Sequence, residues 1–128
     1  MSWCATVLTL FPEMFPGPLA YSLAGKGLNQ GIWHLRTLDI RNFAKDKHKT
    51  VDDTCFEVVD AALQAGLESY QGERPALIYL TPRGAPLNQS KVRSLVANYA
   101  AGALFLCGRY EGVDDRVIRK WESRHGLQ

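Results

Sequence analysis

The sequence predicts an α/β fold in which a parallel β-sheet is flanked by helices on both faces. Apolar segments of strand length alternate with amphipathic segments of helical spacing along the chain. The expected strands are short and nearly all apolar, which is typical of parallel strands covered on both sides. Turns rich in glycine or proline follow two of these strands, at residues 81–84 and 108–112. Ligands bind beyond the carboxyl ends of such strands, so both turns are candidate binding sites.

The first strand is expected at residues 5–11, which are rich in β-branched and aromatic side chains and are followed by a proline. Pro16, with a second proline two residues later, favours the start of a helix that runs through residues 19–24. Gly25 and Gly27 are expected to end this helix.

Alternation of apolar and polar residues over 32–38 predicts a second strand, with an exit loop at 39–42, which completes a βαβ unit. Apolar residues then recur at helical spacing from Val58 to Leu67, which predicts the next helix. Residues 76–80 form a compact apolar run and are expected to be a strand.

The last part of the chain predicts a helix, a strand and a final helix. Asn88 is expected to cap the first of these helices, and residues 103–107 form the strand. Asp114 is expected to cap the final helix, which ends at Gly126. The expected apolar faces are Val92, Leu95, Val96 and Tyr99 on the first helix, and Val117, Ile118 and Trp121 on the second.

The size and composition indicate one globular domain over residues 1–128. The chain is 46% hydrophobic and 22% charged, and its formal net charge is only +2. That charge is too small to indicate a nucleic-acid-binding protein, so any RNA contact must come from local clusters of basic groups. One basic cluster lies in an expected loop and is equally explained as a solvated charged loop. Its members are Lys45, Lys47, His48 and Lys49.

The three cysteines, Cys4, Cys55 and Cys107, are odd in number and show no CxxC spacing. We therefore expect neither a disulfide framework nor a zinc site, and no other metal site is indicated. Cysteines without a disulfide framework fit a reducing compartment, so we expect a cytoplasmic location. The apolar stretch near the N-terminus is short and lacks a preceding basic region, so we expect no signal peptide and no membrane span.

The turn after the last strand presents three functional side chains, Arg109, Tyr110 and Glu111, between Gly108 and Gly112. Glycines at both ends let the backbone bend tightly and approach a ligand. The alternative is an ordinary connection in which the glycines serve only the turn.

The longer string from 106 to 117, Leu-Cys-Gly-Arg-Tyr-Glu-Gly-Val-Asp-Asp-Arg-Val, resembles the donor-loop signature of the bacterial tRNA (guanine-N1)-methyltransferases. That family has a knotted α/β fold of the SPOUT class. Residues 9–15, 46–53 and 78–84 are also similar to family segments and occur in the family's order. Together the four stretches span most of the chain, which is identified as the N-terminal, cofactor-binding part of a member.

The resemblance implies S-adenosyl-L-methionine as cofactor and methylation of guanine N1 next to the anticodon of tRNA. Adenine is recognised well by peptide groups at strand ends, so such a pocket needs close backbone approach more than particular side chains. The cofactor-binding residues implied by the resemblance are Tyr79, Leu80, Thr81, Pro82, Gly84, Gly108, Tyr110, Glu111 and Gly112.

The resemblance also places Glu111 near the site of methyl transfer, where it would hold the guanine or balance the sulfonium charge. Its alternative role is a helix-start carboxylate stabilised by the helix dipole. The general base that takes the N1 proton is expected outside this chain. The implied RNA contacts are Lys45, Lys47, His48, Lys49 and Arg109 to phosphates, and Asp52, with Asp53, to the guanine; an N-cap role for the two aspartates is equally open.

The sequence departs from the family pattern in two places. Asp53 is followed directly by the helix, without the family's glycine-rich, methionine-containing loop, and the chain stops at Gln128, before the segment that completes the knot. We therefore expect an internal deletion, an incomplete trefoil knot, weak cofactor binding and impaired catalysis. The alternative is a non-catalytic remnant or fragment that dimerises or binds RNA.

Family members are homodimers, so a homodimer is expected, with tRNA as partner and no membrane association. A third class is a thiol-dependent enzyme using Cys107 at a strand end. A nucleophilic cysteine needs a histidine or another positive field nearby, whereas a buried strand cysteine is the ordinary outcome.

Overall fold

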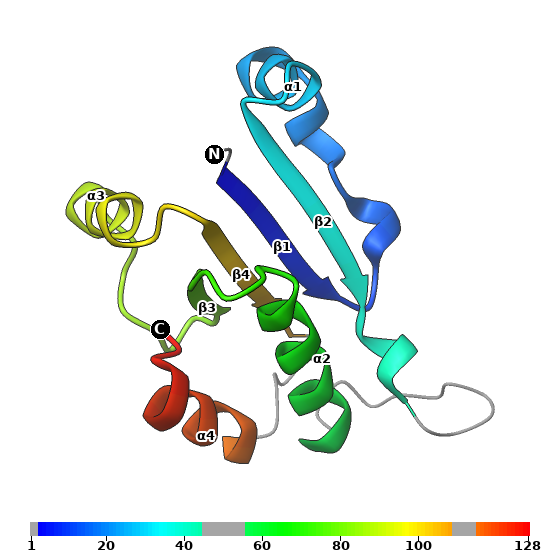
Figure 1. The fold of residues 1–128 in the computed structure, drawn as a ribbon, viewed down its shortest axis with the longest axis vertical. Coiled ribbons are helices and arrows are strands. Elements are labelled where there is room, and N and C mark those ends of the chain that lie inside the picture. Colours follow the sequence, from blue (N-terminus) through cyan, green and yellow to red (C-terminus); the bar gives the residue numbers. More distant parts are fainter. Residues whose placement is uncertain (1–2, 45–55, 109–114) are drawn as a thin grey trace.

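The central element is one sheet of four strands in the order β2-β1-β4-β3, in which every pairing is parallel. The computed structural model describes residues 3–44, 56–108 and 115–128. Figure 1 shows the strands side by side with their carboxyl ends at one edge. This sheet, with its helices, confirms the predicted α/β class. The strands are β1 (Trp3–Thr9), β2 (Trp33–Asp39), β3 (Ala76–Leu80) and β4 (Gly102–Cys107).

Four α-helices and three short 3-10 helices connect the strands of the described segments. None of these helices is long and apolar enough to cross a membrane. The α-helices are α1 (Ser22–Asn29), α2 (Phe56–Glu68), α3 (Gln89–Asn98) and α4 (Asp115–His125). The 3-10 helices are η1 (Pro12–Met14), η2 (Gly17–Ala20) and η3 (Ile40–Phe43).

The main core lies between the sheet and the helix pair α2 and α4, which cover the same face (Figure 1). Leu8 and Leu106 are neighbours in register and are fully buried on this face. Leu63 of α2 and Trp121 of α4 are each 1% exposed and close the core from the helical side. Burial of such large apolar side chains contributes most of the stabilisation of a domain of this size.

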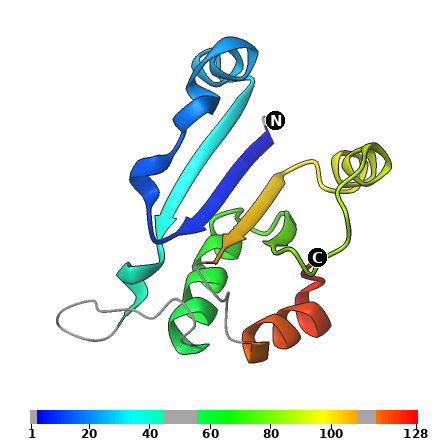
Figure 2. The same cartoon turned by 180° about the vertical axis from the view of Figure 1, so that it is seen from behind.

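The opposite face of the sheet carries α1 at the start of β2. The indole Nε1 of Trp33 donates to the carbonyl of Ala24 at 2.9 Å and fixes this contact. Leu38 of β2 packs against the core. Trp33 lies an odd number of residues before it on the same strand, so Trp33 points to the opposite face, away from α2 and α4. Figure 2 shows this side, where no helix of the described chain lies in front of β1 and β4.

The predicted end of the first helix is wrong. Gly25 and Gly27 lie inside α1, which continues to Asn29. A Cβ atom at Gly25 would stand 2.1 Å from the carbonyl oxygen of Ala20, and one at Gly27 would stand 3.1 Å from the Trp33 ring. These glycines therefore permit close packing and do not end the helix. Gly31, with φ of +73°, follows the true end.

The apolar face expected on the helix after Asn88 is not buried in the structure. Asn88 does cap α3, because its Oδ1 accepts from the backbone N of Lys91 at 2.8 Å. No residue of α3 is buried, however, and Val92 and Val96 are exposed. The helix lies beside the β3 end of the sheet and does not lie over one of its faces (Figure 1).

The remaining elements match the predictions to within a few residues. The strand predicted at 76–80 has those bounds, and the first strand begins and ends two residues earlier than predicted. Its end is set by Thr9, whose Oγ1 accepts from the backbone N of Phe11 at 3.0 Å and turns the chain away. The predicted exit loop after β2 is the 3-10 helix η3.

Candidate functional site

A cleft of about 270 Å³ lies at the carboxyl end of β3, where sheets of this class bind ligands. Three segments form its walls: the end of β3 with the turn after it, one face of α4, and the C-terminal tail. The lining residues are Tyr79, Thr81, Arg83 and Gly84 from the first segment, Asp115, Ile118 and Glu122 from α4, and Leu127 and Gln128 from the tail.

The turn after β3 is held by its own backbone and by one threonine. The Oγ1 of Thr81 accepts from the backbone N of Arg83 at 3.3 Å, and the backbone N of Gly84 donates to the Thr81 carbonyl at 3.3 Å. A Cβ atom at Gly84 would lie 3.4 Å from the Thr81 side chain, so glycine leaves space beside the turn. Two of the turn's N–H groups are therefore satisfied within the turn, which fixes its shape where it lines the cleft.

The tail forms its wall by pairing with the outer edge of β3. The backbone N of Tyr79 donates to the Gln128 carbonyl at 2.9 Å, and the backbone N of Gln128 donates to the Leu77 carbonyl at 2.8 Å. The side-chain oxygen of Gln128 also accepts from the Lys91 ammonium of α3. The tail thus links the sheet edge to α3.

Helix α4 contributes one face to the cleft and the other to the core. Asp115, Ile118 and Glu122 follow each other at helical spacing, so they lie on one side of the helix. Val117 and Trp121 lie on the other side and are buried. The cleft therefore combines a backbone turn, apolar surface, one cation from the turn and two carboxylates from α4, which suits a ligand that carries both polar and apolar parts.

Cys107 at the end of β4 does not have the surroundings of a nucleophile. Burial raises the pKa of its thiol, which disfavours the thiolate that would react. Among the described residues no hydrogen bond or ion pair to this thiol is found. The thiol-dependent alternative therefore lacks support from the geometry.

The structure brings three predicted cofactor residues, Tyr79, Thr81 and Gly84, into the cleft. Leu80 and Pro82 belong to the same segment without lining it, and Leu80 is exposed. Gly108 lies at the same edge of the sheet, because Cys107 pairs with Leu80. The other predicted site residues lie outside the described residues: Lys45, Lys47, His48, Lys49, Asp52, Asp53, Arg109, Tyr110, Glu111 and Gly112, as does the expected cap Asp114.

Several lining residues were missed by the sequence reasoning. Arg83 stands inside a stretch that resembles the family, so its position in the turn was the available signal. Ile118 and Glu122 follow Asp115 at intervals of three and seven residues, which a helical projection would have placed together. Leu127 and Gln128 carry no local signal, because only pairing with β3 brings them to the cleft.

A known protein family matches nearly the whole chain. The model of the family described as tRNA (Guanine-1)-methyltransferase TrmD matches residues 4–125. The chain belongs to this family. The match includes all four stretches on which the resemblance rested and confirms it.

The curated relatives that resemble this TrmD-family chain share one name. The tRNA (guanine-N(1)-)-methyltransferase of Rhodospirillum rubrum is 53% identical over 128 residues, which cover 92% of this chain and 51% of the relative. That of Brucella ovis is 53% identical over 120 residues, 89% of this chain and 48% of the relative. The chain spans about half the length of the curated relatives it matches.

A solved structure supports the same fold for this TrmD-family chain. The crystal structure of tRNA (m1G37) methyltransferase from Aquifex aeolicus superposes with a TM-score of 0.75 at 28% identity. The superposition covers 93% of this chain and 56% of the Aquifex chain. The parallel sheet and its helices are therefore those of the family.

Proposed function

We propose that this chain takes part in S-adenosyl-L-methionine-dependent methylation of guanine N1 next to the anticodon of tRNA. The observation that carries the proposal is that the family-like turn after β3 opens into the cleft, with Tyr79, Thr81 and Gly84 among its lining residues. We also propose that residues 1–128 form a single N-terminal, cofactor-binding domain, consistent with the one continuous sheet.

The residues of the cleft fit the proposed cofactor. The turn at Thr81 and Gly84 lines the cleft with its shape fixed by internal hydrogen bonds, which suits close approach of an adenine or ribose edge. Ile118 and Leu127 supply apolar surface for the cofactor's rings. The cofactor, when bound, supplies the reactive methyl group, and the chain's part is to bind and orient it.

Two further roles belong to the proposal and fall on residues that the structure does not describe. Glu111 would hold the target guanine or balance the positive charge at the methyl donor. The basic residues of the loop and Arg109 would contact tRNA phosphates, and Asp52 would orient the guanine.

Arg83 provides a direct test of the cleft. Arg83 lines the cleft, whereas Arg93 is an exposed arginine of α3 that is not among the lining residues. Arg83→Ala is expected to weaken S-adenosyl-L-methionine binding about threefold to tenfold, because one polar contact is lost. Arg93→Ala is expected to leave binding unchanged, and isothermal titration of the full chain measures both.

Two results would contradict the proposed function. One is the absence of any S-adenosyl-L-methionine binding by the unaltered chain at millimolar ligand. The other is equal weakening by the Arg83 and Arg93 variants, which would place the ligand elsewhere. Transfer of labelled methyl from the cofactor to a tRNA substrate then tests activity itself.

A second candidate function is a non-catalytic unit that dimerises or binds RNA. It is favoured by exposed apolar side chains such as Tyr21 and Leu23 of the α1 region, which are 74% and 81% exposed. A stable dimer in sedimentation experiments without cofactor binding would favour this function over the first.

A further inference from the structure

Helix α4 is the wall that the core shares with the cleft. Val117 and Trp121 are buried on its inner side, and Glu122 is exposed on its outer side, while Ile118 between them packs against the core and also lines the cleft. Helices are rigid over three turns, so a displacement of the inner side moves the outer side with it. The placement of α4 against α2 therefore decides where the cleft wall stands.

Asp60 of α2 holds the middle turn of α4. Its Oδ1 accepts from the Lys120 ammonium at 2.8 Å and from the Trp121 indole Nε1 at 2.9 Å. Trp121 is 1% exposed, so its N–H cannot reach bulk water and needs an acceptor within the protein. Both donors come from consecutive residues, and the two bonds together restrain rotation of α4 about its axis as well as its distance from α2.

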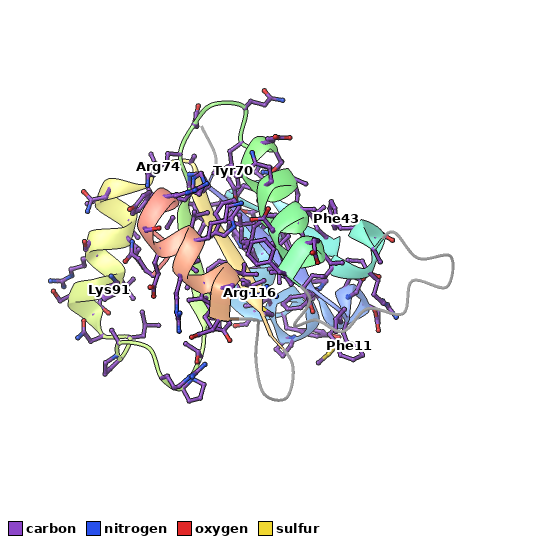
Figure 3. All side chains as sticks on the ribbon, turned by 90° about the horizontal axis from the view of Figure 1, so that it is seen from below. Phe11, Phe43, Tyr70, Arg74, Lys91 and Arg116 are labelled. Atoms are coloured by element: carbon purple, nitrogen blue, oxygen red, sulfur yellow. The ribbon has the colours of Figure 1, made fainter. Side chains whose placement is uncertain are left out.

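Further contacts hold α4 along its length, including core packing of Val117, the Lys120 ammonium 5.8 Å from the centre of the Phe56 ring, and contacts at both ends. The Arg74 guanidinium donates to the His125 carbonyl at 2.8 Å at the last turn. The Arg116 guanidinium lies 5.3 Å from the centre of the Phe56 ring at the first turn. In Figure 3, Arg116 lies at the first turn of α4, and Arg74 lies near its last turn. The middle turn, which carries Ile118, is the part anchored by Asp60.

The ionisation of Asp60 agrees with this role. Burial alone would raise the pKa of its carboxyl, but the hydrogen bonds from Lys120 and Trp121 and the Lys120 charge outweigh burial and lower the pKa. The carboxylate is therefore charged at neutral pH and is available to both donors.

We propose that Asp60 is a positioning residue of the cleft, which fixes Ile118 and Glu122 by holding Trp121 and Lys120 from the opposite side of α4. The identity of the ligand rests on the proposed function, but the positioning itself is a property of the chain alone. Asp60 touches neither the cleft nor its ligand directly, since it is not among the lining residues.

The test reads the cleft wall through the methyl signal of Ile118 in NMR spectra of the full chain. Asp60→Ala leaves the Trp121 N–H without an acceptor and is expected to shift or broaden the Ile118 signal. Asp60→Asn keeps an acceptor but loses the charge, so an intermediate change is expected. Gln64→Ala is the matched control, because Gln64 lies one turn further along α2 and its side chain bonds only to Glu68 among the described residues. The methyl signal of Ile32, remote from α4, should stay in place in every variant.

Cofactor binding gives the second readout. Asp60→Ala is expected to weaken S-adenosyl-L-methionine binding about tenfold, with Gln64→Ala unchanged. If the unaltered chain binds no cofactor, the proposed function fails, and the Ile118 signal still decides the role of Asp60.

An Ile118 signal that is unchanged in Asp60→Ala would overturn the positioning role. If that variant does not fold, Asp60→Asn and Lys120→Met take its place, because both remove the charge attraction and both leave the Trp121 N–H an oxygen acceptor at position 60. A shifted or broadened Ile118 methyl signal with an unchanged Ile32 signal in these two variants supports the role. An unchanged Ile118 signal in both variants overturns it.

Discussion

Tyr70 shows how one buried hydroxyl joins three segments of the chain. Its oxygen accepts from the Thr6 hydroxyl at 2.9 Å, and its proton is shared between the carbonyl oxygens of Cys4 at 2.8 Å and Ala103 at 3.0 Å. The Arg36 guanidinium lies 4.9 Å from the centre of the ring. Tyr70, two residues after the end of α2, is thereby bonded to both central strands of the sheet, β1 and β4.

Tyr70→Phe is expected to destabilise the chain by about 1–3 kcal/mol, because buried carbonyl groups lose their donor and Thr6 loses its acceptor. Tyr99→Phe is the control, since the Tyr99 hydroxyl makes one long contact of 3.4 Å with Gln128 at the surface. Urea denaturation of both variants measures the difference, and equal stabilities would contradict it.

The same residue predicts a pH dependence. Burial raises the pKa of Tyr70 above its ordinary value of 10.0, although Thr6 and Arg36 oppose part of that effect. In the unfolded chain the phenol ionises at lower pH. The contribution of the Tyr70 hydroxyl to the free energy of unfolding is therefore complete below about pH 10 and is lost as the pH rises through the pKa of the folded state. The stability difference between the native chain and Tyr70→Phe should therefore shrink in alkaline solution.

At the scale of elements, the glycines of the helices report packing that local sequence does not reveal. Gly25 in α1 faces the Ala20 carbonyl, and Gly66 in α2 faces the Leu104 side chain. A Cβ atom would lie 2.1 Å from the first and 2.7 Å from the second. The first obstacle is rigid backbone and the second is the end of a side chain, so the two positions differ in what can move.

Gly25→Ala is expected to destabilise the chain by about 1–3 kcal/mol through overpacking. Glycine to alanine in an open helix would instead stabilise by about 0.5–1 kcal/mol. Gly66→Ala should cost less than Gly25→Ala, because the Leu104 methyl can rotate away. Thermal unfolding of the two variants checks both the sign and the order, and a stabilised Gly25→Ala would contradict the packing described.

For the whole molecule, apolar surface is distributed unevenly. The face covered by α2 and α4 forms a closed core, whereas α3 and the α1 region keep large apolar side chains in solvent. Apolar side chains left in solvent are available for burial by association. The proposed homodimer would bury some of it.

Val96→Asp is expected to weaken self-association of the chain, because it places a charge on the apolar side of α3, where Val96 is 64% exposed. Asn98→Asp adds the same charge to the same helix without removing apolar surface, and serves as the control. Sedimentation velocity over a range of concentrations measures both variants, and equal association constants would count against α3 as part of the contact.

Much of the fold could be predicted from the sequence because its signals are local. The apolar run at 76–80 and the cap at Asn88 were located correctly, since a strand period or a capping side chain depends on near neighbours. The family was identified from residues 106–117 and is shown by the match over 4–125. In the cleft, the turn with Thr81 and Gly84 was predicted because it follows a strand end directly, whereas Tyr79 was predicted only from the resemblance to the family.

By itself, then, the sequence determined the α/β class, the family and the turn at which the cleft opens. Only the tertiary structure decided that Gly25 and Gly27 lie inside a helix, that α3 leaves its apolar side exposed, and that Gln128 pairs with β3. It also decided that Asp60 bonds to Lys120 and Trp121, sixty residues further along the chain. Contacts of that range depend on how closely two backbones approach after the sheet has formed, and no local spacing of side chains encodes that distance.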